Sequence, residues 1–320
     1  MSTILVLLTF MISLSPPQDP VQKPLKPRVR QFQYLEDDNP RHRLLVTDTR
    51  VDPGEPPLPM VVWIHGGGWM QGNHQATNRM LDALIRSNRY VVASIGYRLS
   101  DEELWPAQIH DCKAAIKWLK ANASSIGADP GRVAVIGASA GGHLAAMIGT
   151  SGGVPLMSGT LGVHHRMDDR VQCVVDIFGP TDLLKMDSQA MPNPAFKHDA
   201  ADSPESRLLG APLQSVPRLA KSANPITYVS DEDPPFLIIH GTRDAVVPYG
   251  QSVLLRDSLE AAGVEATLLS IENGGHGGPE FEQIHVGVLD FLNQKLSRRP
   301  PDGIREQATT SGKKTPSPKK

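Results

Sequence analysis

The sequence is poor in cysteine, in net charge and in long hydrophobic runs. Its 320 residues include two cysteines, Cys112 and Cys173, which excludes a disulfide scaffold and a cysteine-based metal site. We expect both to be buried, reduced thiols. The formal net charge of -2 excludes the strongly basic surface that is typical of nucleic-acid binding. Hydrophobic residues make up 40% and charged residues 21%, which excludes wholesale disorder and a polytopic membrane protein.

An apolar run opens the chain, from Ile4 to Leu14. Its eleven residues are too few to span a bilayer, but the length suits the hydrophobic region of a signal peptide. Ser13 and Ser15 provide small residues at the cleavage spacing. We therefore predict a signal peptide over residues 1–15 and export to the periplasm or the medium. No Lys or Arg precedes the run, so an uncleaved anchor, or a start codon assigned too early in a cytoplasmic protein, stays open.

The two ends of the chain differ in composition from the middle. Residues 16–27 contain five prolines and are predicted to form an extended linker. Residues 297–320 carry seven Lys or Arg against two Asp or Glu, without periodic apolar residues, which predicts a disordered basic tail. The folded domain is therefore expected over residues 28–296.

Short apolar runs alternate with longer amphipathic stretches in this domain. Six runs have the length of strands, at residues 60–64, 90–95, 132–136, 171–177, 236–239 and 266–271. Four stretches have apolar residues at helical spacing, at 78–85, 107–124, 253–262 and 282–296. The alternation predicts an α/β fold with a mostly parallel, doubly wound sheet and helices on both faces. Residues 179–235 lack clear strands, which predicts a small loop or helical cap over the carboxyl edge of the sheet.

A candidate nucleophile follows the third of these strands. Gly137-Ala138-Ser139-Ala140-Gly141 lies between that strand and a helical stretch, which is the context of a nucleophile elbow. A strand-to-helix turn this tight requires small residues two positions before and two after the serine. We therefore predict that Ser139 is a catalytic nucleophile.

A glycine-rich segment, His65-Gly66-Gly67-Gly68-Trp69, follows an earlier strand. Glycines allow the backbone to approach a substrate and to point N–H groups at a developing oxyanion. We expect the amides of Gly67, Gly68 and Ala140 to form a three-donor oxyanion hole. The alternative, a phosphate-binding loop, requires glycine patterns that are absent here.

Serine catalysis also needs a histidine base and a carboxylate that fixes its tautomer. Asp244 and His276 each follow a predicted strand, and His276 lies in a glycine-rich turn. The order Ser139, Asp244, His276 is the order expected for an α/β-hydrolase. These three residues are therefore the predicted catalytic triad.

The other histidines and acids of the chain are expected to have roles outside the triad. We expect a structural hydrogen bond for His65 and a packing role for His240, while His143 lies one turn into the elbow helix. His164 and His165 lie near two aspartates, but no third ligand follows at metal spacing, so no metal site is predicted. Among the remaining acids, Asp176 lies within a strand, and Asp182 is expected near the substrate pocket but outside the triad.

Together these motifs resemble those of the hormone-sensitive-lipase-like esterases, in the same order and over about residues 40–296. The matching segments are His65–Trp69, Tyr97–Leu99, Trp105–Ala107, Asp111, the elbow from Gly137, Gly241–Asp244 and Gly275-His276. Val174–Asp182 is closer still to the feruloyl and acetyl-xylan esterase-like branch, known as BD-FAE-like. The resemblance implies the α/β-hydrolase fold and the site roles given above. It also implies an ion pair of Arg98 with Asp111 that supports the glycine loop. Trp69 and Asp182 are our expected residues of the substrate pocket.

The expected function is therefore serine carboxylester hydrolysis of short acyl esters, namely acetyl or feruloyl groups on carbohydrate, without metal or organic cofactor. The expected partner is a small-molecule or polysaccharide ester, with no nucleic acid and no stable membrane span. The polar character of residues 179–235 argues against long-chain lipids. Two alternatives stay open: an exopeptidase or acylaminoacyl-peptidase-like hydrolase with the same triad, and a non-catalytic binding protein on the same scaffold. Too few residues precede the core for the propeller common in such peptidases, and His276, which receptor-type relatives lose, is present.

Overall fold

The computed structural model describes residues 27–297, apart from positions 51, 53 and 77. The predicted signal peptide, all but the last residue of the predicted linker, and all but the first residue of the predicted tail lie outside the described residues.

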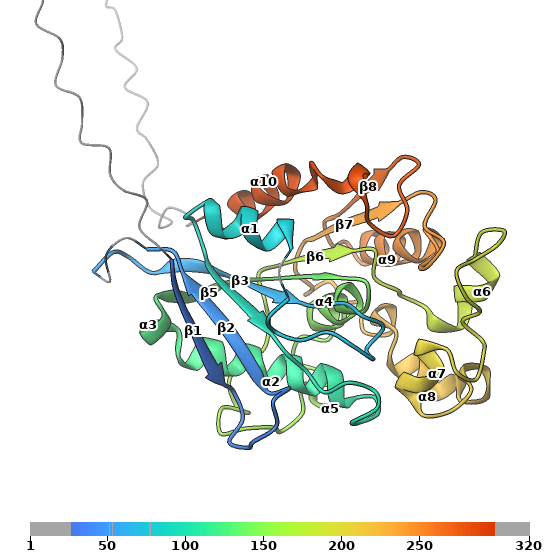
Figure 1. Cartoon of the computed structure of the whole chain (residues 1–320), viewed down its shortest axis with the longest axis horizontal. Coiled ribbons are helices and arrows are strands. Elements are labelled where there is room, and N and C mark those ends of the chain that lie inside the picture. The colour runs from blue at the N-terminus through green and yellow to red at the C-terminus, as the bar shows by residue number, and fades with distance from the viewer. Residues whose placement is uncertain (1–26, 51, 53, 77, 298–320) are drawn as a thin grey trace, which may run out of the picture.

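Eight strands form one sheet in the order β1-β2-β4-β3-β5-β6-β7-β8 (Figure 1). β2 pairs antiparallel with β1 and with β4, and all neighbours from β4 to β8 are parallel. The strands are β1 Arg28–Gln33, β2 Arg43–Asp48, β3 Leu58–Ile64, β4 Val91–Ile95, β5 Ala128–Ala138, β6 Cys173–Ile177, β7 Phe236–Gly241 and β8 Ala266–Ile271. This mostly parallel sheet confirms the predicted fold class.

The helices cover both faces of the sheet. They are α1 Arg79–Arg86, α2 Ala107–Ala121, α3 Ala123–Ile126, α4 Ala140–Thr150, α5 Pro155–Ser158, α6 Met186–Gln189, α7 Pro204–Leu209, α8 Pro217–Ser222, α9 Gly250–Ala261 and α10 Ile284–Leu296, with 3₁₀ turns η1 Leu183–Lys185, η2 Leu213–Ser215, η3 Pro225–Thr227 and η4 Pro279–Phe281. Figure 1 shows α1 and α10 on one side of the sheet and α2, α4 and α9 on the other.

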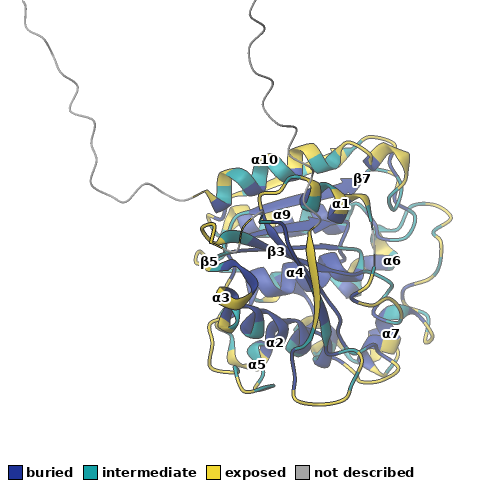
Figure 2. Cartoon of the chain, turned by 60° about the vertical axis from the view of Figure 1, so that its left-hand side comes forward, coloured by how far each residue is buried: buried dark blue, intermediate teal, exposed yellow. Residues whose placement is uncertain are grey.

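Alternation along the strands builds two cores, because successive side chains point to opposite faces. In β3, Met60, Val62 and Ile64 pack with the α2 and α4 side, whereas Val61 and Trp63 pack with the α1 and α10 side. Figure 2 shows most of the sheet buried between helices whose outer surfaces are exposed, with an exposed strand in yellow at the front.

The two N-terminal strands were not expected from the sequence. β1 is exposed along most of its length because it is the edge strand, so its side chains follow no hydrophobic pattern. β2 has a buried alternation at Leu44 and Val46, but it is short. The six predicted strands are all present, and β5 begins earlier than predicted, at Ala128.

The segment between β6 and β7 contains no strand and consists of α6, α7, α8 and the turns η1, η2 and η3. It lies beyond the carboxyl ends of the strands (Figure 1), as predicted for residues 179–235. A backbone hydrogen bond of 2.8 Å, from the Ala195 N–H to the Ala245 carbonyl, links this segment to the loop that follows β7.

Both cysteines are free and buried. Cys112 belongs to the core on one face of the sheet and Cys173 to the core on the other, so the sheet separates the two thiols. Within residues 27–297, as far as they are described, no helix combines the length and apolarity needed to cross a membrane.

Candidate active site

Ser139 lies in the turn between β5 and α4, where φ is 57° and ψ is -125°. A positive φ at a non-glycine residue costs about 1–3 kcal/mol, and such strain is common at functional sites. A Cβ on Gly137 would lie 2.0 Å from the Gly141 carbonyl oxygen, and a Cβ on Gly141 would lie 2.2 Å from that of Ile64. Both positions therefore require glycine, and the turn has the geometry that the sequence predicts.

His276 and Asp244 are brought together by the loops that follow β8 and β7. The Nδ1 of His276 lies 2.6 Å from Oδ2 of Asp244. Oδ1 of Asp244 accepts hydrogen bonds from the amides of Val246 at 2.7 Å and Val247 at 2.9 Å. A carboxylate on Nδ1 fixes the tautomer with its proton on that nitrogen, which leaves Nε2 able to accept a proton.

A second histidine also contacts Asp244. The Nε2 of His240 lies 3.2 Å from Asp244 Oδ2, and its Nδ1 lies 2.6 Å from the Ser252 hydroxyl. Burial raises the pKa of Asp244, but the hydrogen bonds with His240 and His276 outweigh burial and hold the pKa well below its usual range. Asp244 is therefore held as an anion next to His276. His240 was expected only to pack, but it also contacts the Asp244 carboxylate.

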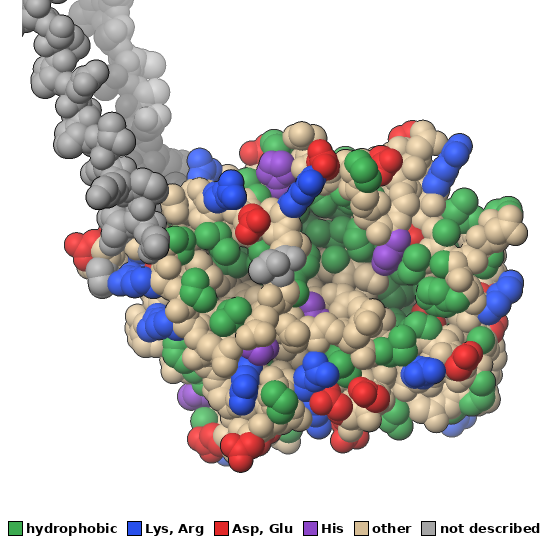
Figure 3. Space-filling model, in the orientation of Figure 1, with side chains coloured by type: hydrophobic (Ala, Val, Ile, Leu, Met, Phe, Trp, Pro, Cys, Tyr) green, Lys and Arg blue, Asp and Glu red, His purple; other side chains and the backbone are tan. Residues whose placement is uncertain are grey.

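Ser139 and His276 line one cavity of about 390 Å³. Gly67, Gly68, Trp69 and Ala140 line the same cavity, so six of the eight predicted site residues border one space. Figure 3 shows this face of the molecule hollowed near its centre, with hydrophobic side chains gathered in the depression.

The glycine loop turns sharply beside Ser139. Gly67 and Gly68 have φ of 107° and 59°, and the Gly67 carbonyl accepts hydrogen bonds from the amides of Met70 and Gln71 at 3.0 and 3.1 Å. Among the described residues, the amides of Gly67, Gly68 and Ala140 have no acceptor in the protein. These three donors are therefore free for an oxygen atom in the cavity.

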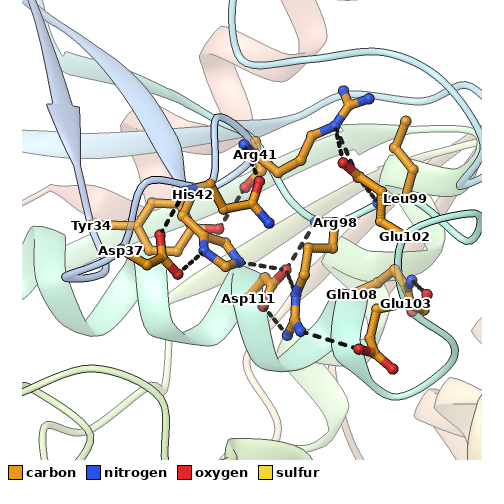
Figure 4. A network of polar contacts seen from close by, with 12 residues as sticks. Tyr34, Asp37, Arg41, His42, Arg98, Leu99, Glu102, Glu103, Gln108 and Asp111 are labelled. Carbon is orange, nitrogen blue, oxygen red and sulfur yellow. Dashed lines mark hydrogen bonds and ion pairs between the residues drawn. The ribbon is translucent and has the colours of Figure 1, made fainter.

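The glycine loop is held from behind by aromatic and polar contacts. The Tyr97 hydroxyl donates to the His65 carbonyl at 2.9 Å, and the two rings stack at 4.3 Å. The Ser100 amide donates to the Trp69 carbonyl at 2.8 Å. Arg41 donates to the Gly72 carbonyl at 2.8 Å and forms an ion pair with Glu102 (Figure 4).

The expected ion pair of Arg98 with Asp111 is present at the centre of this network (Figure 4). Nε and Nη2 of Arg98 lie 2.9 and 2.7 Å from the two carboxylate oxygens of Asp111. The Nε2 of His42 is 3.2 Å from the same carboxylate, and its Nδ1 is 2.6 Å from Asp37. Burial lowers the pKa of His42, but Asp111 and Asp37 outweigh it and raise the pKa.

Two other histidines near the site are held as neutral rings. The Nδ1 of His65 lies 2.8 Å from the Gly66 carbonyl, and the Nε2 of His143 lies 2.6 Å from the Ala223 carbonyl. Burial lowers the pKa of each ring to about 4. His65 thus has the structural hydrogen bond expected of it.

The remaining candidates lie outside the cavity. Asp176 is buried, and burial raises its pKa to about 7 although its carboxylate accepts from the Gly179 amide at 2.8 Å. His164 and His165 lie on a partly exposed loop. Within the described part of the chain, no three His, Cys, Asp or Glu side chains are grouped to hold a metal ion.

The two residues expected at the substrate pocket are placed differently. Trp69 borders the cavity, but the residue is 2% exposed and its Nε1 donates to Nδ1 of His143 at 3.2 Å. Asp182 does not line this cavity; it lines a separate hollow beside α8. Its carboxylate accepts from Asn224 at 2.9 Å and its amide donates to Gln251, and these contacts hold it there.

Phe178, an aromatic residue that packs against His276, was not identified from the sequence. Phe178 follows β6, has φ of 46° and packs its ring 4.4 Å from the ring of His276. It lines the catalytic cavity and also a neighbouring hollow of about 480 Å³, as does Ala138. The second hollow is mainly apolar and includes Trp63 and Phe281. The Phe-Gly-Pro sequence directly after a strand was the available signal.

Two polar residues of the cap were also missed. His198 and Glu205 line the catalytic cavity and pair through Nδ1 and Oε1 at 2.9 Å. Their segment has no hydrophobic period that would mark them.

Comparisons with known proteins identify a sequence family and several related esterases. The sequence model of the BD-FAE family matches residues 51–259, a span that contains Ser139 and Asp244 and ends before His276. The esterase LipC of Mycobacterium tuberculosis is 31% identical over 272 residues, which are 83% of this chain and 65% of LipC. The esterase LipQ of the same organism is 31% identical over 75% of this chain and 56% of LipQ. The chain therefore spans less than two thirds of either relative.

A solved structure, described as a truncated form of a carbohydrate esterase from gut microbiota, has a similar fold. Its TM-score is 0.77 and its sequence identity 32%, over 87% of this chain and 99% of the other.

Proposed function

Because this chain belongs to the BD-FAE family of α/β-hydrolases, we propose that it is a serine carboxylester hydrolase that removes acetyl or feruloyl groups from carbohydrate esters. The observation that carries this proposal is the cavity that Ser139 shares with His276, whose Nδ1 is held by buried Asp244 at 2.6 Å. Similarity to esterases LipC and LipQ and to a carbohydrate esterase supports the reaction class.

In the proposed reaction, Nε2 of His276 takes the proton of the Ser139 hydroxyl as Oγ bonds to the ester carbonyl carbon. The carbonyl oxygen becomes an oxyanion that accepts hydrogen bonds from the amides of Gly67, Gly68 and Ala140. His276 then gives its proton to the leaving alcohol oxygen as the ester bond breaks. Water repeats the sequence on the acyl-enzyme and releases the carboxylic acid and Ser139.

The surroundings of Ser139 support a substrate with one polar and one apolar half. Both spaces are mainly apolar, but the catalytic cavity also includes the polar side chains of His198 and Glu205 from the cap, whereas the adjoining hollow is bordered by the rings of Trp63, Phe178 and Phe281. Sugar hydroxyls suit the former, and the ring of a feruloyl group suits the latter.

The test compares wild type with Ser139→Ala on p-nitrophenyl acetate, acetylated xylan and methyl ferulate. We expect wild-type turnover on these esters and a loss of about 10⁴- to 10⁶-fold in the variant. Wild type that hydrolyses aminoacyl anilides but none of the esters would replace the proposal with the peptidase alternative. Folded wild type that binds the esters without turnover would replace it with the binding-protein alternative.

A further inference from the structure

A buried pair of ionisable side chains forms part of the catalytic cavity without contacting the proposed triad. Glu205 is 2% exposed and His198 is 1% exposed, and the Nδ1 of His198 lies 2.9 Å from Oε1 of Glu205. The other carboxylate oxygen, Oε2, has no hydrogen-bond partner among the described residues. Both residues line the space that contains Ser139 and His276.

The pair is held rigidly by its own segment. Ser203 caps α7 by accepting from the Ser206 amide at 3.0 Å, with Pro204 at the start of the helix. The His198 amide donates to the Asp187 carboxylate at 2.9 Å. These contacts position the backbone that bears Glu205 and His198.

The segment is also fixed to both halves of the catalytic machinery. The Ala195 amide donates to the Ala245 carbonyl at 2.8 Å, next to Asp244. At the other end, Pro204 packs against Gly68, where a Cβ would lie 3.4 Å from the proline Cβ. The pair is thus set between the acid loop and the glycine loop.

An unpartnered buried carboxylate oxygen is costly, because the hydrogen bonds that it makes to water in the unfolded chain are lost without replacement. A hydrophobic side chain would close the wall without this cost. A carboxylate accepts hydrogen bonds only, so the group that satisfies Oε2 must be a donor. No side chain that lines the cavity donates to Oε2 in this structure, which leaves this oxygen able to accept from a donor group of the substrate.

We propose that Glu205, oriented by His198, determines specificity by accepting a hydrogen bond from a sugar hydroxyl next to the ester in the alcohol half of the substrate. The inference rests on the proposed function and deepens it. Glu205 is a binding residue that selects carbohydrate esters over simple alkyl or aryl esters, and His198 is a positioning residue that acts through it.

The experiment compares Glu205→Leu and Glu205→Gln with wild type on acetylated methyl xyloside and on p-nitrophenyl acetate, which has no hydroxyl. Because hydrogen bonds to charged groups contribute about 1.5–3 kcal/mol, we expect kcat/KM on the xyloside to fall about 10- to 100-fold for Leu and less for Gln. The fall on p-nitrophenyl acetate should be clearly smaller than the fall on the xyloside, because p-nitrophenyl acetate has no hydroxyl to donate. Glu36→Leu is the matched control, because Glu36 is an exposed glutamate far from Glu205 in the sequence.

A second arm needs no variant, so it stands even if Glu205→Leu fails to fold. Wild type is assayed on an acetylated xyloside from which the hydroxyl next to the ester has been removed. We expect wild type to lose about the same factor on this deoxy substrate, and Glu205→Gln to lose less than wild type. Equal loss on both esters in the variants, or full wild-type activity on the deoxy substrate, would overturn the inference while leaving the proposed function intact. Wild type that hydrolyses no ester would overturn the proposed function itself.

Discussion

Replacing Asp244 with Asn is expected to remove most of the activity while keeping the shape of the site. In wild type, Oδ2 faces the His276 and His240 rings, and Oδ1 faces two backbone amides. The Asn side chain has one oxygen and one NH₂ group in place of two oxygens. Its NH₂ group must therefore lie against either the histidine rings or the two backbone amides. With Oδ1 kept for the two amides, the NH₂ group faces Nδ1 of His276 and stabilises the tautomer with its proton on Nε2.

That tautomer cannot take the proton of Ser139, and the neutral amide no longer stabilises the imidazolium that forms in the transition state. Loss of both effects in a serine triad lowers kcat by about 10⁴-fold, which corresponds to about 5 kcal/mol. We expect a fall in kcat of about 10³- to 10⁴-fold on p-nitrophenyl acetate, with KM changed less than about threefold.

Steady-state kinetics of Asp244→Asn and of Asp290→Asn, an exposed aspartate on α10, provide the measurement and its control. Urea unfolding of each variant checks that the loss of rate is not a loss of folded protein. Asp244→Asn with a kcat within tenfold of wild type would refute the assignment of Asp244 to the triad, whatever the behaviour of Ser139→Ala.

Three further predictions concern stability. Gly137→Ala places a methyl group about 2.0 Å from the Gly141 carbonyl oxygen, so we expect a loss of at least about 3 kcal/mol in urea unfolding; a loss below 1 kcal/mol would contradict this. The raised pKa of His42 means that its charged form contributes stability below pH 6.5 that is lost as pH rises through the folded-state pKa; the stability advantage of wild type over His42→Gln should shrink between pH 6 and 9, and a constant advantage would argue against it. Burial lowers the pKa of Lys113 from 10.5 to about 8, so the unfolded chain binds more protons than the folded chain between these pH values. The free energy of unfolding of wild type should therefore rise by about 3 kcal/mol relative to that of Lys113→Met as pH rises from 8 to 10.5. No rise would show that burial does not penalise the charged Lys113 side chain.

The catalytic motifs could be predicted because local geometry dictates their residues. The elbow needs glycine at 137 and 141 whatever surrounds it, since a Cβ at either position would overlap a carbonyl oxygen. Asp244 and His276 follow strands, and the carboxyl ends of parallel strands meet at one edge of a sheet. For these residues a pattern of a few neighbours in the sequence contains the information that positions them.

The cap residues could not be predicted because long-range contacts decide where they point. Asp182 was expected near the substrate pocket, but Gln251 on α9 accepts from its amide at 2.7 Å and Asn224 donates to its carboxylate. Glu205 faces the cavity because the segment around it is tied to the loops that follow β3 and β7. β1 was missed for a different reason, since an exposed edge strand has no buried face to impose alternation on its sequence.

The order of strands in the sheet explains why the parts of the site meet around one aromatic ring. β5 bears Ser139 at its end, β7 precedes Asp244, and β6 lies between them. The Ser139 amide donates to the Ile177 carbonyl at 2.9 Å, and the Phe178 amide donates to the Ile239 carbonyl at 2.8 Å, so the end of β6 is bonded to both neighbours. Phe178 is thereby fixed against the His276 ring and borders both the catalytic cavity and the adjoining hollow. The side chain that packs against the proposed base is therefore also a wall that the two spaces share.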